Sequence, residues 1–559
     1  MQVEKNLSAP AYERYLSLSA KKPLKQYRQL KEQLGEHPGW AKLQQAFLDM
    51  IKQYLEVELQ KPVTLNIKAH EAGGQFRIAF AHQMARGDAR VYEYMQQIME
   101  ARKKYTDKKL YHGYVDCHEV HHEIENYIYF QNPLWYLSFP GKDTALESVL
   151  DVAHHVGNWE EGVPHWYDWK THGFVSNWLG TKGVRDYPPF DYQEGNHFRF
   201  VDVVVLAYLA TGEQRYLDLI EDYCDRWCAH IEEHAAKGEP IPCSILPEKA
   251  VSAELNHAGV TDGADQVYQI FYSLVSDNTM YDIAGCLLDV YGITGNKRYL
   301  AASEAMIDQF IQHSAYGRPS HGFSSGAWSK AHLGKYDNPD GKPLGKGHFV
   351  TECAYIARLA LRHNLIAHSD KYKDTVLTWA KSVDEAENDC DQMTASILVA
   401  AHYFDGDPRW LERAYEMALR VAAVSEDQDE FHQCNWAGSR QGTKFLMEML
   451  YTPITGDVEW GTRGNIPVRL FDHHTKDRVG IPENVYTRIW RKEPGCFLLE
   501  AVNLGEETAS WNISMVGGEP LQITKDSQPV ICPELAPGES ARFELRFQPQ
   551  IDVLKEYKR

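Results

Sequence analysis

The sequence has no long apolar run. No stretch of its 559 residues reaches the roughly 18 apolar residues that a membrane-spanning helix needs. The first residues, MQVEKNLSAPAYERYLSL, also lack the apolar core of a secretory signal peptide. We therefore expect a cytoplasmic protein with no membrane partner, although removal of a signal peptide from a longer precursor would leave the same sequence.

The sequence also lacks the cysteine pattern of a disulfide-stapled protein. The ten cysteines form no short-range framework, and Cys224, Cys228, Cys286 and Cys353 fall within apolar helical patterns. This distribution predicts reduced, buried thiols, as in a protein of a reducing compartment.

Positive charge is in deficit, because 58 Lys and Arg stand against 78 Asp and Glu, for a formal net charge of −20. Such a surface does not attract nucleic acid or anionic lipid over most of its area, so neither is expected as a partner. The remaining composition, with 43% hydrophobic and 24% charged residues, is ordinary for a globular protein with a sizeable core. Association into a homo-oligomer stays open.

Residues 194–225 (EGNHFRFVDVVVLAYLATGEQRYLDLIEDYCD) predict a helical hairpin. The run from Phe198 to Ala210 is apolar nearly all round and is broken by Asp202, which predicts an inner helix without a face to offer water. After a turn at 211–213, apolar residues from Tyr216 to Cys228 recur at i, i+3 and i+4. This second pattern predicts an amphipathic helix with one solvent-exposed face.

The hairpin pattern recurs along the chain and indicates a repeat architecture. Six hairpins are predicted, with turns at 87–88, 140–141, 211–213, 295–296, 369–370 and 406–407. Helix pairs that cannot bury their apolar faces alone close around one another, so the predicted fold class is mainly α, an (α/α)6 toroid or barrel. An open helical solenoid shares this pattern. A final apolar helix at 438–451 would make seven hairpins if it pairs with the N-terminal helices.

Three regions are predicted from these patterns. Residues 1–60 form a charged N-terminal helical lead-in, residues 61–460 form the toroid that carries the catalytic site, and residues 461–559 form a small C-terminal β-sandwich domain. After residue 456, short runs of β-formers such as VYTRIWRK and CFLLEAVNLG alternate with Gly, Pro and Asp turns, as is typical of a sandwich.

Long loops between the hairpins are predicted to gather at the rim where the inner helices begin. The loop at 158–194 holds four tryptophans, Trp159, Trp166, Trp169 and Trp178. Flat aromatic faces beside polar groups suit sugar rings, so we expect a carbohydrate ligand. The alternative is that these rings only pin a long loop to the body of the protein.

Ionisable residues are predicted to stand at the same rim, at the start of one inner helix after another. A buried acid is costly unless it is paired, so a recurring ring of acids indicates a solvated funnel. Each of these residues could instead cap a helix. Asp202, Asp282 and Glu352 lie further into apolar helices, where capping is a poorer explanation.

Two carboxylates facing each other across a sugar-binding funnel are what glycoside hydrolysis needs. We therefore predict an exo-acting glycoside hydrolase for a plant or microbial oligosaccharide or polysaccharide, inverting or retaining. The candidate catalytic residues are Asp282, Glu352, His197 and Glu123. The candidate substrate-binding residues are His121, Trp166, Trp178, Asn196, Arg199, Tyr272, Asn278, Tyr281, His348, Trp436 and Arg440.

The serial hairpins with R-Y-L after the turn resemble the six-hairpin glycosidase superfamily, whose toroids mostly hydrolyse or cleave glycans. Residues 349–354 (FVTECA) and 434–440 (CNWAGSR) are also similar to segments of bacterial β-L-arabinofuranosidases. That resemblance implies a zinc ion holding a nucleophilic Cys434, with Glu352 and Cys353 near the metal. The chain departs from the pattern, because Glu and Cys are adjacent and the second segment has a single Cys, so His432 would have to complete the ligand set. The main expectation is no cofactor, with zinc as the alternative.

A third likeness is to heparinase II/III-type and alginate lyases, and rests on residues 195–197 (GNH), residues 262–263 (DG) and Tyr272. It implies a polysaccharide lyase, in which Asn neutralises a uronate while His and Tyr move protons in a β-elimination. The arginines that could bind the uronate are Arg185, Arg199 and Arg440. A sugar epimerase of similar fold and a non-catalytic glycan-binding protein are the remaining alternatives.

Overall fold

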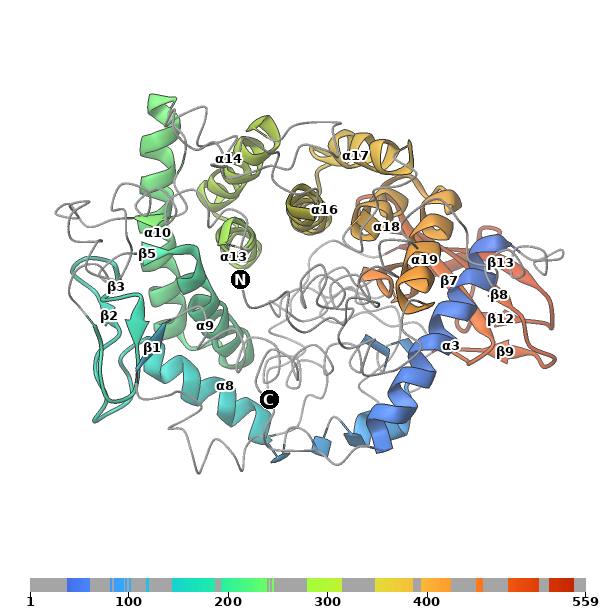
Figure 1. The fold of residues 1–559 in the computed structure, drawn as a ribbon, viewed down its shortest axis with the longest axis horizontal. Coiled ribbons are helices and arrows are strands. Elements are labelled where there is room, and N and C mark those ends of the chain that lie inside the picture. The colour runs from blue at the N-terminus through green and yellow to red at the C-terminus, as the bar shows by residue number, and fades with distance from the viewer. Residues whose placement is uncertain are drawn as a thin grey trace, which may run out of the picture.

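Helices dominate the described part of the computed structural model, and a small antiparallel sheet region lies near its C-terminal end (Figure 1). The described residues are 38–60, 81–82, 85–94, 96–97, 100–101, 117–119, 143–185, 193–238, 241, 244–245, 279–313, 347–385, 394–423, 449–455, 481–511 and 522–546. The mainly helical fold class is therefore confirmed at this level. The predicted domain boundaries stay predictions.

The principal helices include both helices of four predicted hairpins. They are α3 (Gly39–Gln60), α8 (Asp143–Val156), α9 (Phe198–Thr211), α10 (Gln214–Lys237), α13 (Thr279–Thr294), α14 (Lys297–His313), α16 (Gly347–Ala367), α17 (Lys373–Glu385), α18 (Thr394–Asp405), α19 (Pro408–Ala423) and the short α22 (Thr452–Thr455). The predicted turns at 211–213, 295–296, 369–370 and 406–407 each join two of these helices. The turn predicted at 140–141 lies outside the described residues.

Glycines end the first helix of several hairpins. Gly212, Gly295 and Gly406 have φ angles of 70°, 71° and 72°. This left-handed conformation terminates a helix and disfavours any residue with a Cβ. The amide of Gly212 donates to the carbonyl oxygen of Tyr208 at 2.7 Å, and so satisfies one of the last carbonyls of α9.

The predicted difference between inner and outer helices is confirmed for α9 and α10. Almost every residue of α9 is buried. In contrast, α10 buries one face, which includes Tyr216, Ile220, Tyr223 and Trp227, and exposes the other. Figure 1 shows α9, α13, α16 and α18 following one another along an arc, with α10, α14 and α17 on its outer side.

A basic residue followed by an aromatic residue lies at the start of α14 and just before α17, and each pair contacts the preceding outer helix. Arg298 donates to both carboxylate oxygens of Glu232 on α10, at 2.7 and 2.8 Å. Its neighbour Tyr299 donates its hydroxyl to Asp225 of the same helix at 3.2 Å. We call such a pair a staple, because it attaches one hairpin to the previous one.

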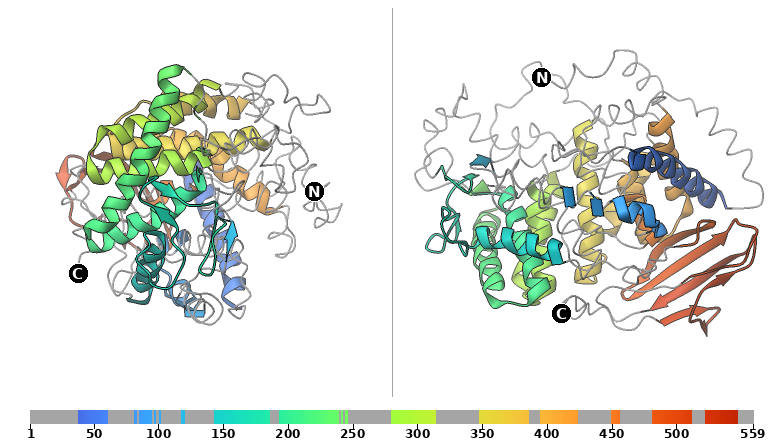
Figure 2. Two further views of the ribbon diagram at one scale, coloured as in Figure 1. Left: turned by 90° about the vertical axis from the view of Figure 1, so that its left-hand side faces the viewer. Right: turned by 90° about the horizontal axis from the view of Figure 1, so that it is seen from below.

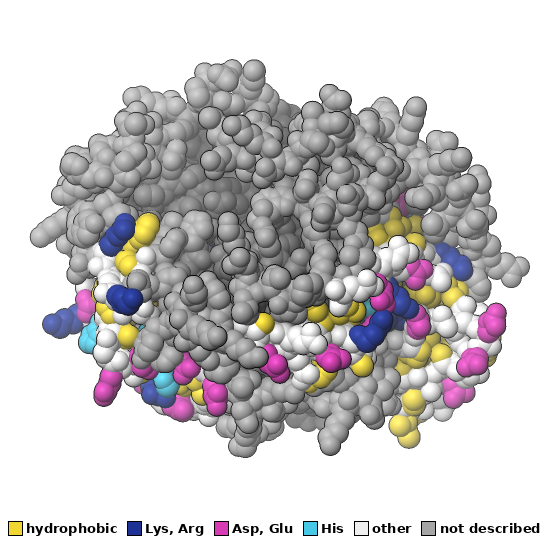
Figure 3. Space-filling model, turned by 60° about the horizontal axis from the view of Figure 1, so that its bottom comes forward, with side chains coloured by type: hydrophobic (Ala, Val, Ile, Leu, Met, Phe, Trp, Pro, Cys, Tyr) yellow, Lys and Arg dark blue, Asp and Glu magenta, His cyan; other side chains and the backbone are white. Residues whose placement is uncertain are grey.

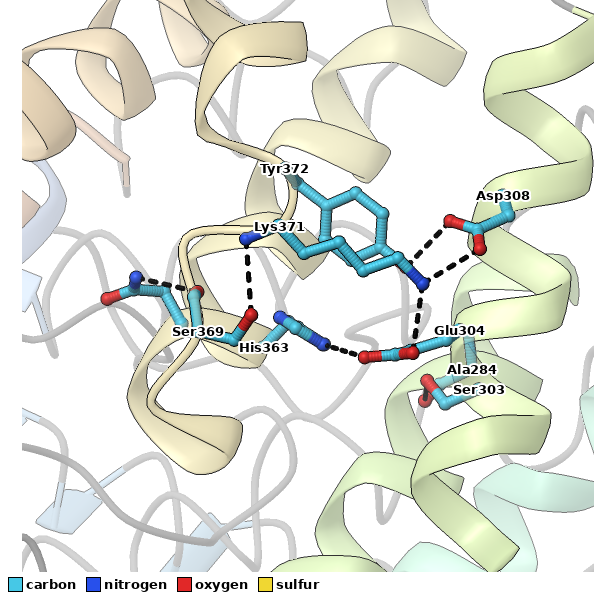
Figure 4. A network of polar contacts seen from close by, with 9 residues as sticks. Ala284, Ser303, Glu304, Asp308, His363, Ser369, Lys371 and Tyr372 are labelled. Carbon is cyan, nitrogen blue, oxygen red and sulfur yellow. Dashed lines mark hydrogen bonds and ion pairs between the residues drawn. The ribbon is translucent and has the colours of Figure 1, made fainter. Parts of the chain in front are cut away.

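The staple recurs at the next hairpin (Figure 4). Lys371 Nζ lies 2.9 Å from Glu304 and 2.8 Å from Asp308 of α14, and Tyr372 donates its hydroxyl to Asp308 at 3.0 Å. The Nε2 atom of the buried His363, on α16, bonds Glu304 at 2.7 Å. The R-Y-L signal of the sequence therefore corresponds to a contact between neighbouring repeats.

The C-terminal region is β-rich, as predicted. Its five-stranded sheet has the order β11-β10-β13-β8-β7, with neighbouring strands antiparallel. The strands are β7 (Val485–Glu493), β8 (Cys496–Asn503), β10 (Gln522–Lys525), β11 (Gln528–Pro529) and β13 (Ser540–Arg546), and β9 (Ala509–Ser510) pairs separately with β12 (Glu534–Leu535). Trp511, which follows β9, packs edge-on against Phe543 of the larger sheet at 6.1 Å. The sandwich form of this region stays a prediction.

The described surface agrees with the acidic composition. On the face drawn in Figure 3, Asp and Glu side chains are spread along the described surface, with Lys and Arg between them. Among the described helices, none combines the length and apolar character that crossing a bilayer requires.

Candidate functional site

The N-terminal ends of α9 and α13 lie side by side and are joined by a buried ion pair. Arg199 Nε donates to Asp282 Oδ2 at 2.7 Å, and the two side chains are 2% and 1% exposed. The residues are 83 positions apart in the sequence. The structure therefore brings two predicted site residues together.

The pair matters to stability mainly because loss of either partner would leave the other charge buried and unpaired. Each charge alone would lack water, and an unpaired buried charge costs several kcal/mol. Removing one partner of such a pair destabilises a protein by about 3–5 kcal/mol. In the pair, Asp282 carries a negative charge that its partner Arg199 balances.

A short 3-10 helix, η2 (Gly195–His197), precedes α9 and contains two more predicted site residues, Asn196 and His197. Both are buried, at 1% and 0% exposure. His197 Nε2 donates to the carbonyl oxygen of Ser176 at 2.9 Å, and its ring stacks on Phe174 at 4.8 Å. These contacts fix the orientation of the imidazole.

The two predicted aromatic platforms of the loop at 158–194 contact the protein itself. Trp166 is 1% exposed and donates its indole N–H to the carbonyl oxygen of Gly180 at 3.0 Å. Trp178 lies under the guanidinium of Arg185, 4.0 Å from the ring centroid. These contacts favour the alternative in which the rings hold the loop, and a substrate-binding role for either ring stays a prediction.

The other predicted residues are not placed by the described side chains. Tyr281 belongs to the first turn of α13, and His348, Glu352 and Cys353 belong to the first turns of α16, but only the backbone is described there. The following lie outside the described residues: His121, Glu123, Tyr272, Asn278, His432, Cys434, Trp436 and Arg440. Their predicted roles stay predictions.

The predicted zinc site cannot be assembled from described atoms. Within the described ranges, no group of three or more His, Cys, Asp or Glu residues could hold a metal ion. The described cysteines of the helices, Cys224, Cys228 and Cys286, are free and buried, as predicted. Burial raises the pKa of the Cys286 thiol well above its ordinary value, and neighbouring Cys224 and Asp202 add to the rise. Such a thiol is a poor nucleophile.

Sequence reasoning missed a second buried ion pair. Arg362 of α16 pairs with Asp289 of α13, and both side chains are at most 2% exposed. The available signal was the spacing of seven residues between Asp282 and Asp289, which places both on one face of an apolar helix. The partner, Arg362, has no such local signal.

Several charged side chains are buried on the described parts of the inner helices α9, α13 and α16. On these described helices the buried arginines and aspartates are Arg199, Arg358, Arg362, Asp202, Asp282 and Asp289. Among the side chains described on these helices, Asp282 and Asp289 each pair with an arginine of a neighbouring helix. Pairing of this kind is what makes a buried charge tolerable.

Comparison with known proteins gives distant structural likenesses. No protein-family model matches the sequence, and no curated protein matches it. Among solved structures, the chain is similar to a family GH127 β-L-arabinofuranosidase from Geobacillus stearothermophilus T6, at 10% identity over 97% of this chain and 81% of that one, with a TM-score of 0.22. It is also similar to a second GH127 β-arabinofuranosidase, at 10% identity over 96% of this chain and 78% of that one, with a TM-score of 0.22.

Proposed function

We propose that the protein is a glycoside hydrolase whose helical hairpins close into an (α/α)6 toroid. One observation carries the proposal: the Arg199–Asp282 pair joins the N-terminal ends of two neighbouring inner helices. Because the hairpin turns lie at the opposite ends, the inner helices run in the same direction, and α16 also begins at this end. Acids on successive inner helices then face one opening.

The proposed chemistry uses two carboxylates. Asp282, which carries a negative charge in its ion pair, would act as the base or nucleophile. Glu352, on the next inner helix, would be the protonated acid that serves the leaving oxygen, with Glu123 as the other candidate. The sugar would be oriented by Asn196 and His197. Arg199 would hold the carboxylate of Asp282 in place. The substrate would be the terminal residue of an oligosaccharide or polysaccharide.

Zinc binding is an alternative that the proposed chemistry does not require. A carboxylate, two thiolates and an imidazole, from Glu352, Cys353, Cys434 and His432, are a donor set that zinc accepts. If present, the ion would lower the pKa of a bound thiol. None of the steps above depends on it.

The test is a screen of chromogenic glycosides and uronic-acid oligosaccharides with the full-length protein. We expect the folded fraction of Asp282→Asn and of Glu352→Gln, measured by circular dichroism, to lose at least about a thousandfold in kcat. Asp289→Asn is the matched control, because it removes a buried, ion-paired carboxylate from the same helix, away from the first turn. Its folded fraction should keep wild-type kcat.

Other outcomes separate the alternatives. Formation of a product with an ultraviolet-absorbing C4–C5 double bond, abolished by His197→Ala, would identify a lyase. Full activity of Asp282→Asn and Glu352→Gln would reject the assignment of both residues. Binding of a sugar without any product would make the protein a glycan-binding module.

A further inference from the structure

The free edge of the C-terminal sheet is covered by a side chain of the N-terminal helix. β7 is the last strand of its sheet, so one side of its backbone has no strand partner among the described strands. Gln44 of α3 occupies that side. Its Nε2 donates to the carbonyl oxygen of Thr487 at 2.7 Å, and its Oε1 accepts from the amide of Thr487 at 3.0 Å. A side-chain amide bonded in both directions satisfies an edge strand much as another strand would.

The same two residues connect further helices. Gln44 Nε2 also donates to the hydroxyl of Tyr415 on α19 at 3.0 Å, across 371 positions of sequence. Tyr415 donates that hydroxyl to the carbonyl oxygen of Leu450 at 3.1 Å. Thr487 Oγ1 donates to the carbonyl oxygen of Ile454 in α22 at 2.9 Å. Gln44 and Thr487 together therefore link four elements, α3, α19, α22 and β7.

The residues just before β7 hold a second early segment of the chain. The amide of Ile481 donates to the carbonyl oxygen of Ala85 at 2.9 Å. Arg86 Nη1 donates to the carbonyl oxygens of Pro482 at 2.8 Å and Val485 at 3.0 Å. Early helical residues are thus fixed to the sheet by backbone groups and by a partly buried guanidinium.

Side chains of β7 also reach the turns of the last described hairpins. Arg488 Nη1 donates to the carbonyl oxygen of Gly406 at 2.6 Å, and Arg491 forms an ion pair with Asp370. Trp490 lies against the same glycine, since a Cβ added there would stand 2.4 Å from its Nε1. These turns are at the end of the inner helices opposite the candidate site.

We propose that the C-terminal sheet is a clasp, in which β7 fastens α3 and the segment around Arg86 to α19 and to the turns at 369–370 and 406–407. Figure 2 shows the sheet beside α3 and the last helices, away from α9 and α10. Short turns join the two helices of each hairpin and staples join neighbouring hairpins, whereas α3 meets α19 without any nearby chain connection. Such a contact carries a large loop-closure entropy, which a sheet docked on both sides offsets. The clasp is what completes the circuit of helices.

Two glycines provide a matched test of the clasp. Gly406 and Gly295 have the same left-handed φ, 72° and 71°, at equivalent turn positions, so alanine causes the same backbone strain at each. Nothing lies within 4 Å of a Cβ at Gly295, whereas a Cβ at Gly406 displaces Trp490. Hydrogen exchange of the full-length protein, followed by mass spectrometry, reports each helix separately.

We expect Gly406→Ala to accelerate amide exchange in α3 and β7 by about tenfold or more. Gly295→Ala should leave exchange in α3 at the wild-type rate and act only on α13 and α14. Unchanged exchange of α3 in Gly406→Ala, or equal acceleration in both variants, would overturn the proposal.

A second pair of variants tests the clasp without altering the glycine turn. Arg491→Gln breaks the contact of β7 with Asp370, whereas Lys492→Gln, at the next position, breaks only a contact with Glu544 inside the sheet. We expect faster exchange of α3 in Arg491→Gln and wild-type exchange in Lys492→Gln. The reverse order, or no effect in either variant, would contradict the clasp. No catalytic assay enters these measurements, so they do not depend on the proposed hydrolase.

Discussion

Buried histidines should make the fold sensitive to mild acid, and His82 allows the size of the effect to be worked out. Its side chain is 5% exposed, and its Nδ1 lies 3.1 Å from the hydroxyl of Tyr451. Burial, together with the positive charge of Arg86, lowers the pKa of His82 from 6.5 to about 3. The folded protein therefore keeps this imidazole neutral, while the unfolded chain protonates it below pH 6.5.

The sign follows from proton linkage. Between pH 6.5 and about 3 the unfolded state binds one more proton at His82 than the folded state, so stability falls as the pH falls. At pH 5 the loss from this one residue is about 2 kcal/mol, from 1.36 kcal/mol per pH unit over roughly 1.5 units. Burial also lowers the pKa values of His363 and His402, so their contributions have the same sign.

Chemical denaturation at pH 8, 7, 6 and 5, followed by tryptophan fluorescence, measures the effect. We expect the free energy of unfolding to decline as the pH decreases, and His82→Gln to remove about 2 kcal/mol of that decline between pH 8 and pH 5. His165→Gln is the control, because His165 is exposed. A wild-type stability that is level from pH 8 to pH 5, or a His82→Gln profile parallel to that of the wild type, would refute the reasoning.

Two further substitutions test contacts that hold the hairpins and the first long loop. Arg298→Gln should lower the free energy of unfolding by about 1 kcal/mol, because it removes a partly exposed staple. Arg409→Gln should lower it by less, because Arg409 pairs only with Asp407 inside the same turn. Chemical denaturation of both variants measures the difference. Asn158→Ala should cost roughly 2–4 kcal/mol, because Asn158 has φ 61° and its amide bonds the backbone of Trp166 and Tyr167. Limited proteolysis should then cleave the loop at 158–185 first, and wild-type resistance there would contradict this role.

The hairpins could be predicted because their causes are local. A glycine in the left-handed conformation ends a helix wherever it occurs, and the apolar periodicity of α9 and α10 states which helix lies inside. The partner of Asp282 could not be predicted in this way. Periodicity places a side chain on a face of its own helix, but it does not say that Arg199, 83 positions earlier, lies opposite. The R-Y-L motif likewise predicts a repeat but not what the motif does. In the structure its Arg298 and Tyr299 contact the preceding hairpin.

The burial of Asp282 changes the argument that led from acids to a funnel. Recurring interior acids predict a solvated funnel, yet at α9 and α13 Arg199 neutralises the acid with almost no exposure to solvent. A structural pair and a catalytic pair make different predictions when both charges are removed together. Replacing both partners of a buried ion pair by apolar residues is often neutral, whereas each single replacement costs about 3–5 kcal/mol. We therefore expect Arg199→Met with Asp282→Leu to recover stability that either change alone loses. If Asp282 also performs the chemistry, the stable double variant should show no turnover. A stable double variant with wild-type turnover would make the pair structural and would move the catalytic acids elsewhere on the rim.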